Sequence, residues 1–324
     1  MKRSKVDGLL AKIEGVSGTD AAPVAGTNGI QVDEHLWGTL ETDHLEKNTR
    51  ENATGSAMGR HGGAQPAGRY GKVTLTAALK GAGVAYAGGV RPEIDVLLRA
   101  AGLAGVVSGG VGAEQVAYTP VTDELESATL HVYAAGSLFK LVGSRGKLSI
   151  SAIAARIGFA KFEIWGRLIE GPSDAALPAI VYPRRAIRPP VAASAALLLD
   201  GYGPSWKSFE FNTTTDVQAR PRGNAPGGHA GYEIVDYAPE FSTQIDSPVK
   251  AAFDPWALEA AGTEFPWSLA VGAVQYNHWY LEGSNGRVTK VPPQEDSGFA
   301  MINLGIQAMN ADAAPFAPFS LVFS

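Results

Sequence analysis

The chain has 324 residues, of which 45% are hydrophobic and 18% are charged, so it can form one large domain or two smaller ones. A net charge of −5 argues against a dedicated nucleic-acid binder, because phosphate binding needs a clustered basic surface. The sequence contains no cysteine, which excludes disulfide frameworks, thiolate zinc sites and a cysteine nucleophile.

No stretch has the length of a membrane span or of a signal peptide's apolar core. The start, MKRSKVDGLLAKIEG, is basic but too polar for a signal peptide. The longest apolar stretch, at 191–199, has less than half of the roughly 20 residues that a spanning helix needs. We therefore expect a protein without membrane contact that is made in the cytoplasm. The 39 glycines and 20 prolines favour short strands joined by turns, and so a mainly β fold.

In chain order, residues 1–29 combine a short apolar patch with a turn-rich stretch and are predicted to form an N-terminal arm. A strand is expected around 37–45. Residues 47–71 contain six glycines and almost nothing apolar, and a loop of this length is usually functional or disordered. Alternating apolar residues predict a strand at 72–80. A proline near its start and a glycine at its end predict a helix at 92–102.

Two stretches, at 143–160 and 283–300, begin with Gly-Ser-x-Gly and a basic residue and end with Gly-Phe-Ala. We interpret the Gly-Ser-x-Gly as a turn and each stretch as part of an antiparallel hairpin with one buried side. The apolar residues of the closing strand correspond at the same spacing of 140 positions, Phe162 and Ile164 to Ile302 and Leu304.

Both halves of the chain contain the same order of elements. Each has a strand, a helix ending in Ala-Ala-Gly, another strand, the Gly-Ser-x-Gly stretch and a hairpin. We therefore predict an internal duplication. The expected organisation is an arm at 1–29, a first β domain at 30–180, a connector at 181–200 and a second, duplicated β domain at 201–324.

Motifs for chemistry are absent from the sequence. The six histidines are scattered without metal-ligand spacing, the Gly-Lys turns lack the phosphate-loop pattern, and no Gly-x-Ser-x-Gly follows a strand. His131, within an expected strand, is interpreted as a hydrogen-bonded sheet residue. We predict that the protein is not an enzyme and has no catalytic residue, cofactor or metal ion.

The stretches LLAKIEGVSGTDAAP, LLRAAGL and the run from 118 to 178 together resemble the tail tube proteins, or major tail proteins, of siphophage-type bacteriophages. The resemblance covers the first 180 residues, and the second half by element order only. Ser17 departs from it, because an aromatic residue is expected there, and the helix end lacks a cysteine. The matching positions are Leu10, Ala11, Lys12, Glu14, Gly18, Thr19, Asp20, Pro23, Leu97 to Ala100, Gly143 to Gly146, Asp174, Ala175, Leu177 and Pro178.

The resemblance implies tail-tube-type β-sandwich or barrel domains with short flanking helices, whose sheets join across subunits into a ring. Rings would stack into the tail tube of the virion, a channel through which DNA passes into the host without being bound specifically. Two tube domains in each chain would give a trimeric, pseudo-hexameric ring, which we favour, whereas one domain would require a hexamer. Tape-measure, tail terminator and distal tail proteins are the implied partners.

Three groups of residues are candidates for this assembly. The arm at 1–29 and the loop at 47–71 are expected to stack rings, with an idle surface loop as the alternative. A lumen built for DNA transit should be neutral or acidic. An exposed strand face with salt bridges would explain the acidic residues chosen as lumen candidates equally well. The candidates are Arg50, Glu51, Arg60, His61, Arg69 and Tyr70 for ring stacking, Lys161, Glu163, Trp165 and Arg167 for a subunit-interface strand, and Glu41, Asp43 and Glu46 for the lumen.

Three other functions remain open. A carbohydrate-binding β-sandwich module would cluster exposed aromatic residues on one sheet face, whereas this sequence spreads its tryptophans. A head-decoration or tail-terminator protein would form rings without filaments. An enzyme would need a carboxylate pair that cannot be recognised without geometry.

Overall fold

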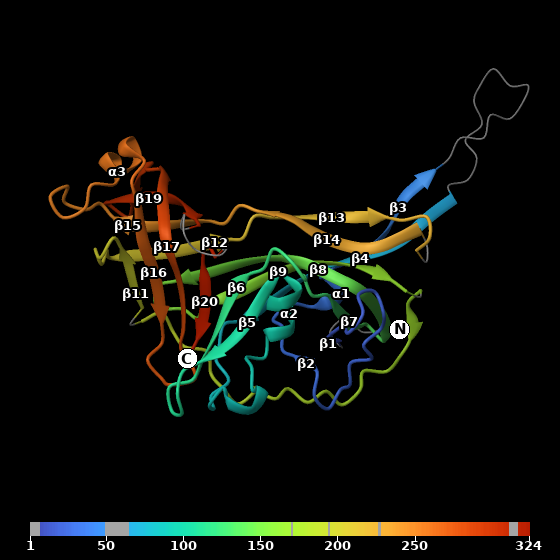
Figure 1. The fold of residues 1–324 in the computed structure, drawn as a ribbon. Coiled ribbons are helices and arrows are strands. Elements are labelled where there is room, and N and C mark those ends of the chain that lie inside the picture. Colours follow the sequence, from blue (N-terminus) through green and yellow to red (C-terminus); the bar gives the residue numbers. More distant parts are fainter. Residues whose placement is uncertain (1–6, 49–64, 170, 194, 226–227, 311–316) are drawn as a thin grey trace, which may run out of the picture.

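The computed structural model describes residues 7–48, 65–169, 171–193, 195–225, 228–310 and 317–324. The fold is mainly β and its strand pairs are antiparallel, as predicted. Figure 1 shows two β-rich lobes, the first built from the N-terminal half of the chain and the second from the C-terminal half.

The first half forms a sheet whose strands pair in the order β3–β4–β9–β8–β7–β1–β2. Two short helices, α1 (Leu36–Thr39) and α2 (Asp95–Ala100), and a 3-10 turn at Ala87–Gly89 accompany it. The strands are β1 (Asp7–Ile13), β2 (Gly29–Ile30), β3 (Leu40–Asn48), β4 (Gln65–Ala78), β5 (Leu103–Ser108), β6 (Gln115–Pro120), β7 (Ala128–Ala134), β8 (Ser137–Ile153), β9 (Phe159–Leu168) and β10 (Ser173–Asp174).

The second half forms a sheet in the order β12–β15–β19–β17–β16–β11. Its helix α3 (Pro255–Ala261) lies between β15 and β16 in the chain, as α2 lies between β4 and β7. The strands are β11 (Ala196–Leu199), β12 (Trp206–Asn212), β13 (Thr215–Pro221), β14 (His229–Tyr237), β15 (Glu240–Asp246), β16 (Glu264–Val271), β17 (Trp279–Lys290), β18 (Pro293–Asp296), β19 (Phe299–Met309) and β20 (Ser320–Phe323).

The two halves share one order of strands in space and in sequence. Position by position, β1, β3, β4, β7, β8 and β9 of the first half occupy the places of β11, β12, β15, β16, β17 and β19 of the second. The connector predicted at 181–200 therefore ends inside the second sheet, because β11 pairs with β16.

The halves are joined edge to edge through β8. Its first part pairs with β7, and its last part, from Ser149 to Ile153, pairs with β12. The strands β3–β4–β9–β8–β12–β15–β19–β17 therefore form one continuous sheet across the chain. On the C-terminal side, β20 pairs with both β17 and β6 and ties the halves together a second time.

The core lies on one side of this sheet because apolar residues alternate along each strand. Phe162 and Ile164, and likewise Ile302 and Leu304, are almost fully buried, which confirms the facing predicted for the two closing strands. Their register differs between the halves, because Phe162 pairs with Leu148 whereas Ile302 pairs with Ile245 and Pro293. An aromatic cluster of Phe209, Phe211, Phe241, Trp267 and Phe319 fills the core of the second half.

Several boundaries differ from the prediction. Residues 7–13 of the predicted arm form β1, which pairs with β2 and β7, because its Leu-Leu-Ala run is apolar enough to enter the core. Of the predicted loop at 47–71, residues 65–71 belong to β4 and residues 47–48 to β3, while 49–64 lie outside the described residues. The expected strand at 37–45 begins only at Leu40, after α1.

The Gly-Ser-x-Gly stretches are not turns. Residues 143–146 and 283–286 lie within β8 and β17, where each strand holds one residue more than its neighbour and the register shifts. Gly143 has φ of +59°, a left-handed conformation that glycine adopts without strain. A β-bulge needs the same permissive residue as a tight turn, so the sequence pattern alone favoured the wrong one of the two.

Candidate assembly surfaces

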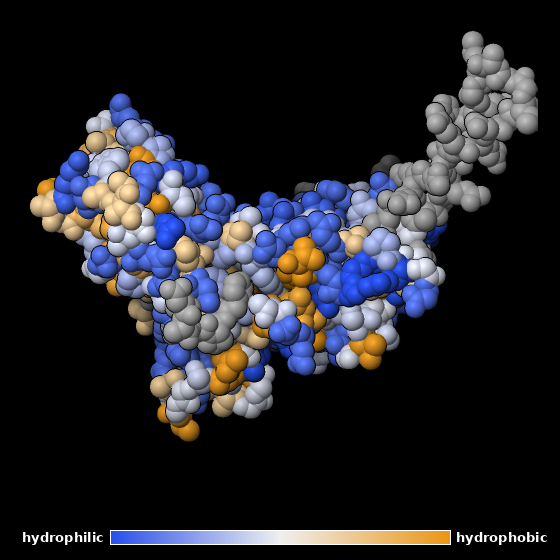
Figure 2. Space-filling model, turned by 45° about the horizontal axis from the view of Figure 1, so that its top comes forward, coloured by the Kyte–Doolittle hydropathy of each residue, from blue (hydrophilic) through white to orange (hydrophobic). Residues whose placement is uncertain are grey.

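The side of the continuous sheet away from the core carries mostly polar residues, and we call it the polar face. In Figure 2, which brings the top of the molecule forward, hydrophilic residues predominate between the two lobes and hydrophobic residues gather in smaller patches. By strand register, the polar face contains Glu41, Asp43, Tyr70, Lys72, Lys147, Ser149, Ser151, Lys161, Glu163, Trp165, Arg167, Ser208, Glu210, Asn212, Glu240, Ser242, Gln244, Asn303 and Gln307.

The polar face brings together residues that the sequence analysis assigned to three different surfaces. Glu41 pairs with Lys72, and Lys72 with Trp165. In the same way Asp43 pairs with Tyr70, and Tyr70 with Arg167. The predicted lumen residues Glu41 and Asp43, the predicted interface residues Lys161, Glu163, Trp165 and Arg167, and the predicted stacking residue Tyr70 therefore share one face.

The remaining candidates are placed only in part. Arg69 is exposed on β4, and Glu46 belongs to β3, where its backbone pairs with Ala67. Strand β9 pairs with β4 on one side and β8 on the other, so it offers a face but no open edge to another subunit. Four predicted stacking residues, Arg50, Glu51, Arg60 and His61, lie outside the described residues.

A charge cluster lies at the centre of the polar face in the first half. Lys72 and Lys147 each place their Nζ 3.4 Å from Oε2 of Glu163. Both ammonium groups also lie over the ring of Trp165, at 5.4 and 5.6 Å from its centre. Partial burial opposes ionisation of Glu163, but Lys147 and Lys72 hold its pKa below the ordinary value. Two cations share one carboxylate here, so much of the positive charge is neutralised locally.

Two strand edges of the continuous sheet are open. In the described part of the chain, β3 pairs only with β4, which leaves its other edge without a partner. At the far end, β17 pairs with β16 only as far as Arg287, and among the described strands the following residues and β18 pair only with β19. The corresponding stretch of β8, from Ser149 to Ile153, pairs with β12. Open edges of this kind present unpaired N–H and C=O groups to another strand.

The β13–β14 hairpin lies over β8 of the first half. Nη1 of Arg145 on β8 donates to the carbonyl of Tyr232 at 2.6 Å and lies 3.1 Å from Oε2 of Glu233. Tyr237 donates its hydroxyl proton to the carbonyl of Gly102 at 3.0 Å. The sequence analysis missed this hairpin, although alternation at 215–221 and 229–237 around a glycine-rich stretch was a usable signal.

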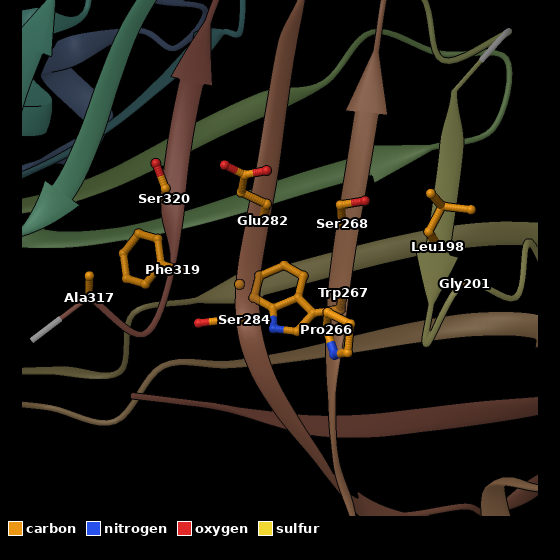
Figure 3. Close-up of a pocket in the computed structure, with 11 residues that line it drawn as sticks. Leu198, Gly201, Pro266, Trp267, Ser268, Glu282, Ser284, Ala317, Phe319 and Ser320 are labelled. Carbon is orange, nitrogen blue, oxygen red and sulfur yellow. The ribbon is translucent and has the colours of Figure 1, made fainter. Parts of the chain in front are cut away.

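A cavity of about 470 Å³ opens beside the bulge of β17 in the second half. Figure 3 shows Glu282 and Ser284 of β17 beside Trp267 and Ser268 of β16, with Ser320 on β20. Burial raises the pKa of Glu282. Glu282 is the single ionisable group among the described residues that line the cavity, so these residues provide no acid–base pair.

Two further observations concern the described residues only. No group of three or more histidine and acidic side chains converges as a metal site requires. No helix there is both long and apolar enough to cross a bilayer. In comparisons with known proteins, no family model and no curated protein matches this sequence.

Proposed function

We propose that this chain is a non-enzymatic structural protein that assembles into stacked rings and forms the tail tube of a bacteriophage, a channel for DNA passage into the host. The observation that carries the proposal is the junction between β8 and β12 within the chain. It joins two sheets of the same strand order. The open edge of β3 corresponds to the edge of β12 that is paired in this junction, and the open edge of β17–β18 corresponds to that of β8.

Repetition of this junction between chains would close a ring. The first half meets the second through β8 and β12, so the second half of one chain would meet the first half of the next through β17–β18 and β3. Such a contact is heterologous, and it ends when the rotation closes. Closure pairs both open edges of the continuous sheet, as in a barrel, and removes the risk of uncontrolled pairing there.

The matching strand order supports an internal duplication, with the two halves as tube domains. Three chains would then supply six domains, and the ring would be a trimer with pseudo-sixfold symmetry. A hexamer would be needed if only the first half lined the channel. The two-domain ring is favoured because β12, β15 and β19 continue the sheet of the first half without a break.

The part of the polar face that the β13–β14 hairpin leaves uncovered would line the channel. The hairpin lies over the Tyr70 end of this face, where the ring centres of Tyr70 and Tyr232 are 6.3 Å apart. The polar face presents hydroxyl and amide groups with charges of both signs, and its central lysines are paired with Glu163. DNA moving along such a wall meets few unpaired cations, so it is not held. Location in the virion tail, and tape-measure, terminator and distal tail proteins as partners, are further parts of the proposal that rest on the sequence resemblance.

The carbohydrate-binding alternative has less support from the structure. Trp267 and Trp279 are buried in the core, and Trp165 packs beneath two lysines. Of the large exposed apolar residues in the described part of the chain, Trp37 and Phe299 are the aromatic ones, and they belong to different halves. A sugar-binding face needs several aromatic rings side by side.

Negative-stain electron microscopy of the purified protein over a range of concentrations tests the proposal. We expect hollow tubes at high concentration, with rings as intermediates. Rings that never lengthen would favour a decoration or terminator protein instead. A monodisperse monomer at every concentration and salt would refute the assembly altogether.

A further inference from the structure

We propose that the β3–β4 hairpin of one copy lies over β17 of a second copy at residues 283–287, as the β13–β14 hairpin lies over β8 within a single chain. This inference rests on the proposed ring, and it adds a second contact to the pairing of strand edges. The occupant of the surface is a second copy of this chain.

The first step is the cover that β13–β14 provides. Residues 141–146 of β8 are all buried, including the charged Arg145, whose side chain is 7% exposed. The two backbones meet directly, since a Cβ built on Gly143 would lie 3.6 Å from the Cα of Gly231. Arg145 satisfies the Tyr232 carbonyl and pairs with Glu233, so a buried cation holds the hairpin in place.

The second step is that no described strand covers the same motif in the second half. Glu282, Ser284 and Arg287 are exposed, and Gly283 and Asn285 are half-buried. Figure 3 shows Glu282 and Ser284 beside the cavity that opens here.

Arg287 follows the bulge of β17 as Arg145 follows the bulge of β8. Its side chain is 44% exposed, and Glu264 on the neighbouring strand is its one ion-pair partner among the described residues. Among the described residues, this part of β17 thus lacks a strand layer like the one that covers β8.

The third step identifies the occupant. β12 and β15 continue into β13 and β14, and β3 and β4 occupy the same two places in the first sheet. Figure 1 shows β3 and the beginning of β4 projecting beyond the first lobe. The β3–β4 hairpin therefore has the position, relative to its own half, that β13–β14 has relative to the second half.

The fourth step fixes the register of the contact. Gly146 and Val288 follow their bulges by the same number of residues. Gly146 pairs with Ile164, which pairs with Val73 of β4. In the second half, Val288 pairs with Ile306, which pairs with Phe241 of β15. Val73 and Phe241 are therefore equivalent positions.

Counting back equally from Val73 and Phe241, Arg69 corresponds to Tyr237. Tyr237 contacts Gly102, which ends the Ala-Ala-Gly of α2, and Gly262 ends the same motif after α3 with a left-handed φ of +62°. Arg69 of one copy should therefore lie beside Gly262 and Thr263 of the next.

Cysteine cross-linking tests this contact, because the chain has no cysteine of its own. The Arg69→Cys and Thr263→Cys double variant changes two exposed side chains, so the fold should persist. We expect mild oxidation of the assembled protein to link chains into covalent dimers and trimers on a denaturing, non-reducing gel. The matched control combines Arg69→Cys with Ser108→Cys, an exposed position on β5, and should stay monomeric on the gel.

Electron microscopy of the same samples separates the two levels of the proposal. Rings or tubes with covalent oligomers support both. Rings or tubes in which the double variant gives no more cross-linking than the control would overturn the hairpin contact and leave the ring standing. Failure of any variant and of the unmodified chain to assemble would overturn the contact and the proposed function together.

Discussion

At the scale of single residues, Arg145 has the most demanding position in the first half. Its guanidinium donates to the carbonyls of Leu125, Glu126 and Tyr232 and pairs with Glu233, so it binds β8 to two other segments at once. A buried cation is tolerated only when its donors find acceptors, and here they do. The sequence shows only a basic residue after Gly-Ser, since its partners come from distant parts of the chain.

We therefore predict that Arg145→Ala lowers the free energy of unfolding by about 2–4 kcal/mol, because it leaves buried carbonyls without donors. Arg220→Ala removes an exposed partner of the same Glu233 and should cost less than about 1 kcal/mol. Urea denaturation followed by circular dichroism measures both. Equal losses in the two variants would contradict the role of Arg145.

Histidine burial makes stability depend on pH. His229 begins β14 and is fully buried, with no hydrogen-bond partner for either ring nitrogen in the described structure. Burial, and then the nearby Arg167, lower its pKa, and burial also lowers those of His131 and His278. The unfolded chain then binds more protons than the folded one below the ordinary histidine pKa of about 6.5.

Stability should therefore fall as the pH drops from 7.5 through 6.5 and below. Thermal melts at pH 7.5 and 5.5 would measure the loss, and His229→Phe should remove part of it. His35 is largely exposed, so His35→Gln is a matched control that replaces a histidine without changing the core. A pH dependence that His229→Phe leaves intact would show that this group does not contribute.

At the scale of elements, alternation predicted the strands around 72–80 and 159–168, and helix punctuation predicted a helix at 92–102, of which α2 forms the part Asp95–Ala100. They did so because each of these elements has one face in the core, and burial follows the period of the backbone. The bulges of β8 and β17 were not predicted, since a bulge is defined by the neighbouring strand. The sequence analysis assigned residues of the polar face to separate surfaces. It did so because the register between β3, β4 and β9 depends on residues far apart in the chain.

The open edge of β3 makes a prediction at this scale. Neighbouring residues of a strand point their N–H groups to opposite edges, so of Glu41→Pro and Thr42→Pro only one removes a donor from the β3–β4 ladder. The other leaves the ladder intact and blocks the open edge. We expect one of the two variants to have the melting temperature of the unmodified protein and yet to remain unassembled. Sedimentation velocity measures the assembly. Normal assembly of both variants would contradict pairing at this edge.

At the scale of the whole molecule, the balance of charge decides how the protein treats DNA. The net charge is −5, and the central lysines of the polar face share a carboxylate. We predict no measurable binding of duplex DNA at an ionic strength of about 0.15 M, by fluorescence anisotropy. Glu163→Gln frees both lysines and should increase binding at low salt, while micromolar affinity of the unmodified protein at the higher salt would argue against a transit channel.

The junction of β8 with β12 also has a kinetic consequence. Because both strands belong to one polypeptide, this junction forms without any bimolecular encounter, at an effective concentration set by the chain segment that connects them. In a closed trimer every second seam would be of this kind, so fewer free particles have to lose their translational entropy. Fusing two repeats into one gene product would thus lower the protein concentration at which nucleation becomes possible.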